Sequence, residues 1–217
     1  MRIKNLLLSY PRSGNTWCRY FIEYVSEMPT RGCGGAVYDQ YIKRKPHRLN
    51  YRSLAIVQKE HFARKCLYHN PKRDNIILII RNPKECIVRH NGPEILSSKR
   101  LGVVLSEYMS NLKLYDEWTS KRMLVYYEDI IKNFKAESKR IVEFLNLKPD
   151  RYHTFMKNYD YHRKRCIEIY SNGRGLSKTK GKKAIHHSKS NKNFGNMNNI
   201  IDKVYPKFKK TYLKRYF

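Results

Sequence analysis

The sequence is short of acidic residues and lacks the long apolar segments of membrane proteins. Its 217 residues include 18 Asp plus Glu against 46 Lys plus Arg, a formal net charge of +28. The apolar run Ile3–Leu8 is far shorter than the roughly 18 residues that a membrane-spanning helix needs, and no signal peptide pattern is present. The five cysteines are odd in number and irregularly spaced, which is typical of a reducing compartment. We therefore expect one soluble, cytoplasmic domain without a membrane span.

Several signatures of ligand chemistry are missing as well. The eight histidines and five cysteines show no metal-ligand spacing, so we expect no metal. No zinc-finger or RNP-like motif accompanies the basic residues, which disfavours a dedicated nucleic-acid-binding module but leaves non-specific affinity open. The charge itself has three readings: an anionic acceptor such as an acidic glycan, weak nucleic-acid affinity, or plain solvation by a Lys- and Asn-rich composition.

The most informative segment that is present reads SYPRSGNTW and spans Ser9–Trp17, directly after the first apolar run. It has the layout of a strand, a tight loop and a helix start, which is how α/β proteins aim backbone N–H groups at a phosphate. A Walker A loop is excluded because Asn15 follows Gly14 where that motif needs Lys, which disfavours a nucleotide kinase. Arg12 must supply the cation instead.

A second segment, Asn75–Ile80, is a continuous β-branched apolar run that predicts a strand buried on both faces of a parallel sheet. It is followed by Arg81, Asn82 and Pro83, with the proline suited to the first turn of a helix. Arg81 therefore lies at the carboxyl end of a central strand, where open α/β sheets bind ligands, and a guanidinium can hold a phosphate with two hydrogen bonds.

Taken together, these two segments resemble the nucleotide-binding motifs of the PAPS-dependent sulfotransferases, where PAPS is 3′-phosphoadenosine 5′-phosphosulfate. Two further segments match in family order: LAIVQKEH at 54–61 resembles the strand that ends in a catalytic His, and MLVYYED at 123–129 resembles a later strand. The resemblance implies a three-layer α/β fold with a mostly parallel sheet, similar to P-loop NTPases. It also implies PAPS as sulfuryl donor and PAP, the desulfated nucleotide, as product.

The resemblance assigns roles residue by residue. The 5′-phosphosulfate would be held by Arg12, Ser13, Gly14, Asn15 and Thr16, the 3′-phosphate by Arg81, and adenine by Trp17 and Tyr127. From the residues alone, Trp17 and Tyr127 could equally pack in the core. Two departures from the family pattern stand out: Arg89 occupies the place of a usual Ser beside the 3′-phosphate, and the closing Arg-Lys-Gly loop is matched only by Lys180 and Gly181.

Sulfuryl transfer needs cations at the bridging oxygen and a base for the acceptor hydroxyl. Arg12 and Lys59 supply the charge in this interpretation, and His61 is the general base, with Glu60 in reserve. An ordinary His would titrate with a pKa near 6.5, so we expect the rate to rise with pH through about that value. The acceptor is expected to be a small molecule or glycan. The competing functions are a basic nucleic-acid-binding protein and a nucleotide kinase-like enzyme.

The remaining pattern gives the chain's organisation. We expect one domain over residues 1–217, a mobile basic segment around 170–199, and a C-terminal basic helix. Alternating elements indicate a parallel sheet covered by helices on both faces. The expected strands are 3–9, 54–58, 75–80 and 123–127, and the expected helices are 15–27, 83–90, 104–119, 134–145 and 150–160.

Overall fold

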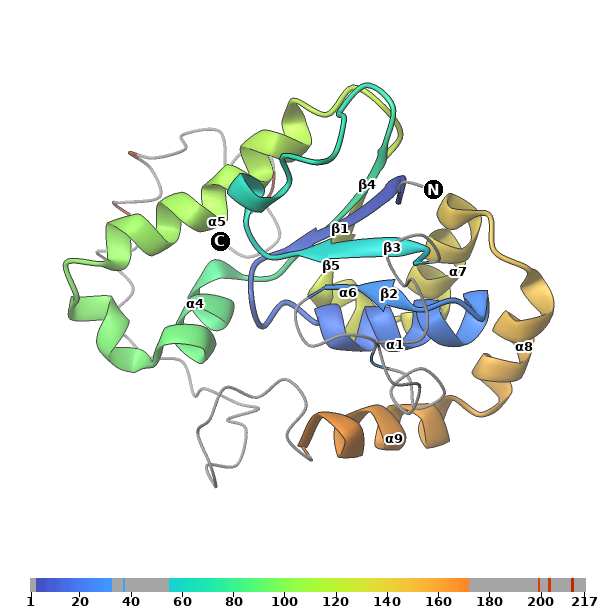
Figure 1. Ribbon diagram of the computed structural model, residues 1–217. Helices are drawn as coiled ribbons and strands as arrows, with labels where there is room; N and C mark the ends of the chain where they lie inside the picture. Colours follow the sequence, from blue (N-terminus) through green and yellow to red (C-terminus); the bar gives the residue numbers. More distant parts are fainter. Residues whose placement is uncertain are drawn as a thin grey trace, which may run out of the picture.

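A computed structural model describes residues 3–32 and 55–171, together with the single residues 37, 199, 203 and 212. In these residues five strands form one sheet in the order β2-β3-β1-β4-β5, and every neighbouring pair is parallel (Figure 1). The strands are β1 (Asn5–Ser9), β2 (Thr30–Arg31), β3 (Val57–Glu60), β4 (Asn75–Ile80) and β5 (Arg122–Tyr126). The expected parallel α/β sheet is confirmed.

Helices cover both faces of the sheet, which makes three layers. The helices are α1 (Asn15–Ser26), α4 (Pro83–Asn91), α5 (Leu101–Asp116), α6 (Tyr127–Lys132), α7 (Phe134–Leu145), α8 (Pro149–Lys157) and α9 (Tyr159–Ser171), with short 3-10 turns at Ala63–Lys65 and Pro93–Ser97. Figure 1 shows α4 and α5 on one side of the sheet and α1, α8 and α9 on the other. Within the described ranges, no helix combines the length and apolarity required to cross a membrane.

Strand alternation divides the core between the two faces. Leu6 and Leu8 of β1 pack with α4 and α5, whereas Leu7 packs with α1, α7 and α8. Because successive side chains of a strand point to opposite faces, the middle of a strand with both faces covered must be apolar on both, as Leu6–Leu8 and Ile76–Ile80 are. Tyr212 joins the α5 side of the core and donates a hydrogen bond to Asp116.

Sheet register places the motifs side by side. β1 lies between β3 and β4, with Leu8 opposite both Glu60 and Leu78. In chain order, β1 is followed by β2 at the sheet edge, then by β3 beside β1, and then by β4 on the other side of β1, so the strand order changes direction at β1. In open α/β sheets, this switch point is where ligands bind at the carboxyl ends of the strands.

Several element boundaries differ from expectation. The third strand along the sequence, β3, runs to Glu60 rather than ending at residue 58, because backbone pairing with β1 continues past the apolar residues. The expected helix 104–119 begins and ends three residues earlier, as α5, and the expected helix 150–160 is two helices, α8 and α9. The two-residue strand β2 and the short helix α6 were not predicted. Most of the 170–199 segment and of the C-terminal region lies outside the described residues.

Candidate active site

The loop between β1 and α1 has the geometry of an anion site. Gly14 is the N-cap of α1 in a left-handed conformation with φ 84°, and its cap position provides no side-chain hydrogen bond. No acidic residue lies in the first turn of α1. The backbone N–H groups at this end therefore keep their capacity to bind an anion, and the helix dipole favours negative charge there. Arg12 also has a positive φ, 69°, a costly conformation for a residue other than Gly.

Contacts within the protein fix this loop. Asn15 is buried and donates from Nδ2 to Ser9 Oγ at 3.0 Å, so its side chain ties the helix start to the strand end. A Cβ added at Gly14 would lie 2.6 Å from Cδ2 of Tyr127, so this position has neither the space nor the backbone conformation for another residue. The ring of Tyr127 thus forms one wall of the loop, and the Arg81 guanidinium lies 4.1 Å from the centre of the same ring.

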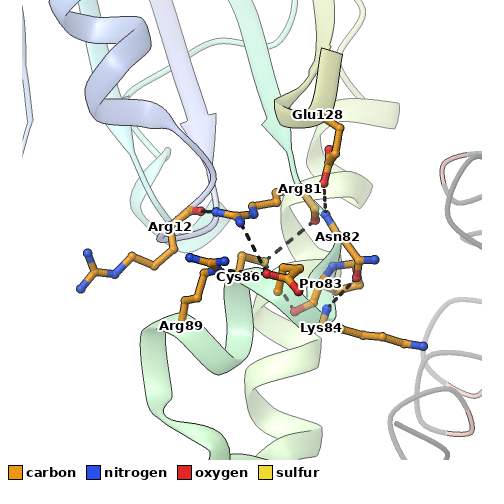
Figure 2. A network of polar contacts seen from close by, with 9 residues as sticks. Arg12, Arg81, Asn82, Pro83, Lys84, Cys86, Arg89 and Glu128 are labelled. Carbon is orange, nitrogen blue, oxygen red and sulfur yellow. Dashed lines mark hydrogen bonds and ion pairs between the residues drawn. The ribbon is translucent and has the colours of Figure 1, made fainter. Parts of the chain in front are cut away.

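Arg81 joins the two sequence motifs directly. Its Nη1 donates to the backbone oxygen of Arg12 at 2.9 Å, across 69 residues of sequence (Figure 2). Its own carbonyl oxygen accepts a 2.7 Å hydrogen bond from the Tyr108 hydroxyl. The side chain of Arg12 extends away from Arg81 in Figure 2, so the two guanidinium groups face different regions.

Arg89 lies beside Arg81 because both pair with one acid. Glu85 Oε2 is 3.0 Å from Nε of Arg89 and 3.5 Å from Nη2 of Arg81. At the start of α4, the Asn82 side chain accepts from Lys84 N, and Glu128 accepts from Asn82 N (Figure 2). The site that the sequence assigned to a 3′-phosphate therefore contains two guanidiniums, that of Arg81 directly after β4 and that of Arg89 on the capped helix α4.

His61 reaches the same loop from β3. Its Nδ1 donates to the carbonyl oxygen of Ser9 at 2.8 Å, which places the ring proton on Nδ1 and the lone pair on Nε2. Burial lowers the pKa of His61 to about 4, with a further decrease from the charge of Lys59, while the hydrogen bond to Ser9 opposes both. The expected value near 6.5 is therefore wrong: His61 is a neutral ring well below pH 6.5.

Lys59 is buried inside β3 rather than lying beyond the strand end, and it is only 4% exposed. A Cβ at Gly32 would approach its Cβ and Cδ to 3.0 Å, so the lysine stem runs against the end of β2. Glu60, the reserve base, accepts a hydrogen bond from Gln58 at 3.0 Å. The lone pair of His61 is thus oriented by the Ser9 contact, whereas the Glu60 carboxylate is paired with a side chain of its own strand.

Two residues at this site were missed by sequence reasoning. Asn111, buried on α5, donates to the carbonyl oxygen of His61 at 2.9 Å and accepts from Ala63 N at 2.8 Å, which holds the chain on both sides of Phe62. His90 packs edge-on against Tyr10, and burial together with the charge of Arg12 lowers its pKa. A polar residue amid the apolar positions of 101–116 was the available signal for Asn111.

Trp17, one of the two residues expected to contact adenine, packs against other aromatic side chains of the protein. Trp17 packs in an aromatic cluster with Tyr20, Phe134, Phe155 and Tyr159, which is the core role that the sequence left open. Ser13 is buried and Thr16 is partly buried in the first turn of α1. Lys180 and Gly181 lie outside the described residues. Among the described side chains, no group of three or more potential metal ligands gathers.

Comparisons with known proteins find sulfotransferases among the relatives of this chain. No family model matches the sequence. Sulfotransferase 2A1 of Rattus norvegicus is 28% identical over 188 residues, which cover 70% of this chain and 63% of that protein. A WSCD family member of Aedes aegypti is 25% identical over 163 residues, which cover 64% of this chain and 49% of that relative. The chain thus spans less than two thirds of the curated relatives it matches.

The fold matches a solved sulfotransferase. The crystal structure of mouse sulfotransferase SULT7A1, complexed with PAP, superposes with a TM-score of 0.52 at 16% identity, covering 98% of this chain and 86% of that one. Together with the curated relatives, this shared fold confirms the predicted class, a parallel α/β protein of sulfotransferase type. The sequence relatives and this shared fold make the chain similar to the PAPS-dependent sulfotransferases.

Proposed function

We propose that this protein transfers the sulfuryl group of PAPS to a hydroxyl group of an acceptor, or less readily to an amine. The observation that carries the proposal is the position of His61: a neutral ring, oriented by Ser9, at the same strand edge as the Arg12 loop and next to buried Lys59. A base and two cations around an anion-binding helix start are the parts that sulfuryl transfer requires.

The donor sites fit a nucleotide with two separated anionic groups. On the 5′ side, the first-turn N–H groups of α1, the guanidinium of Arg12 and the ammonium of Lys59 would hold the phosphosulfate. On the other side of the loop, Arg81 and Arg89 would hold the 3′-phosphate. Gly14 suits the close approach of a phosphate because nothing projects from its backbone, and PAPS supplies the sulfuryl group that moves.

The transfer itself exchanges one bond for another. The acceptor oxygen forms a bond to sulfur while the bond from sulfur to the 5′-phosphate oxygen breaks, and the electron pair leaves with PAP. Nε2 of His61 takes the acceptor proton as the new bond forms. Arg12 and Lys59 stabilise the charge that develops on the bridging oxygen. Asn111 acts as a positioning residue, because it holds the backbone of His61 and not the reacting atoms.

The acceptor would enter beside Phe62, which follows His61. The guanidinium of Arg64 lies 5.1 Å and the ammonium of Lys65 lies 5.9 Å from the centre of the Phe62 ring. An aromatic ring bordered by cations favours an acceptor with an apolar or sugar body and an anionic group, which supports the anionic acceptor among the three readings of the overall charge.

Thermal unfolding with added PAP, ATP or DNA tests the donor assignment. A ligand at 100 times its Kd stabilises the native state by about 2.7 kcal/mol, so PAP at saturation should raise Tm clearly and ATP should do so much less. Arg12→Ala should weaken PAP binding by about 1.5–3 kcal/mol, the worth of charge-assisted hydrogen bonds, and abolish transfer. Tight DNA binding at physiological salt with no response to PAP would contradict the proposal.

A further inference from the structure

Glu85 lies where a ligand phosphate would meet Arg81 and Arg89. One oxygen of its carboxylate, Oε2, contacts both guanidiniums, at 3.5 Å and 3.0 Å. The arginine side chains are only 11% and 12% exposed, whereas that of Glu85 is 31% exposed. The carboxylate thus occupies donor groups of both arginines, and it offsets one of the two positive charges.

We propose that Glu85 is an internal competitor for the anion site formed by Arg81 and Arg89, and that it sets how strongly this site selects a nucleotide with a second phosphate. The proposal rests on the proposed function, because it assigns that phosphate to the same pair. A dianionic phosphate beside the guanidiniums would lie within a few ångströms of the carboxylate, and like charges at that distance repel. Binding must therefore displace Glu85 from at least one guanidinium.

The N–H groups of Arg81 are already engaged in a way that makes Glu85 and a bound phosphate compete for them. Nη1 is engaged by the Arg12 carbonyl and Nη2 by Glu85, while Nε is buried and has no hydrogen-bond partner in the described part of the chain. An arginine offers a fixed fork of N–H groups, so a phosphate that takes two of them must use the edge that Glu85 now holds.

Arg81 should keep its place when Glu85 moves or is replaced. The Arg12 carbonyl and the Tyr127 ring hold its guanidinium independently of Glu85. Asn82 caps α4 through Lys84 N, so the start of this helix does not depend on Glu85 either. A substitution at Glu85 therefore changes the charge of the site and leaves its framework in place.

The experiment measures Kd by calorimetry for PAP and for adenosine 5′-monophosphate, which lacks the 3′-phosphate, with wild type, Glu85→Gln and Glu85→Asp. The control is Glu143→Gln, which removes the same charge from an exposed pair with Lys139 on α7. Glu85→Gln should tighten PAP binding about three- to tenfold, the scale of losing two partly exposed competing ion pairs. Adenosine 5′-monophosphate should change less than twofold, and the shorter Asp should act in the same direction.

The outcomes separate this inference from the proposed function. Weaker PAP binding by a folded Glu85→Gln variant would make Glu85 a support for the arginines and overturn the inference. Equal gains for both nucleotides, or the same gain in Glu143→Gln, would reduce the effect to overall charge and also overturn it. If wild type itself failed to prefer PAP, the 3′-phosphate assignment would fall, and both proposals with it.

Discussion

Replacing His61 by Asn tests the proposed base most directly. The Asn amide can donate to the Ser9 carbonyl as Nδ1 of His61 does, but it has no counterpart of the basic Nε2. We therefore expect His61→Asn to bind PAP within about twofold of wild type and to lose about 10²-fold or more in turnover with any acceptor that supports the reaction. His61→Ala should in addition leave the buried Ser9 carbonyl unpaired, at about 1–3 kcal/mol of stability.

The pKa of His61 gives the same variant a second readout that needs no acceptor. The folded-state pKa is about 4 and the ordinary value is 6.5, so the unfolded chain binds more protons between these pH values. The free energy of unfolding should therefore decrease as pH falls from 6.5 to about 4, by at most about 3 kcal/mol at 1.36 kcal/mol per pKa unit, and less with solvent screening.

Urea unfolding of wild type and His61→Asn from pH 4 to 7 measures this difference. His162 contributes equally to both proteins, whereas the charge of His90 is coupled to that of His61, so the difference between the two curves reports His61 together with this coupling. NMR titration of the His61 ring should give a pKa near 4, and PAP should raise it, because a bound anion stabilises the imidazolium. Parallel curves together with a ring pKa near 6.5 would refute the reasoning.

Three further substitutions test the framework. Arg81→Ala should weaken binding of PAP more than that of adenosine 5′-phosphosulfate, measured by calorimetry; equal losses would make Arg81 purely structural. Gly14→Ala should destabilise the protein by about 1–3 kcal/mol in urea unfolding, because φ is positive and the Tyr127 ring blocks the Cβ; a neutral effect would contradict the loop geometry. Asn111→Ala should lower kcat while the Kd for PAP stays unchanged, since the side chain holds the His61 segment; unchanged kcat would remove its positioning role.

The parts of the fold that the sequence predicted are those with strong local patterns. Strand β4 is apolar from Ile76 to Ile80 and has the expected bounds, and the amphipathic helix α7 also has the expected bounds. The end of strand β3 was predicted two residues too early, because Lys59 and Glu60 are residue types typical of a loop. Backbone pairing with β1 needs no apolar side chain and continues through both residues. The two residues of β2 are too few to form a pattern.

The contacts within the site could not be predicted in this way, because their acceptors are backbone carbonyl groups. His61 is held by the carbonyl of Ser9, and Arg81 by the carbonyl of Arg12. Because every residue has a backbone carbonyl, the residue types of Ser9 and Arg12 do not indicate these contacts in the sequence. Only the register of β3 and β4 against β1 brings these groups together. A backbone acceptor also survives substitution of its own residue. Arg12→Ala therefore removes a cation from the proposed 5′ site, while the backbone carbonyl that holds Arg81 remains. Arg81→Ala removes a cation, a hydrogen bond and a ring contact at once. Arg12→Ala is for this reason the cleaner test of charge.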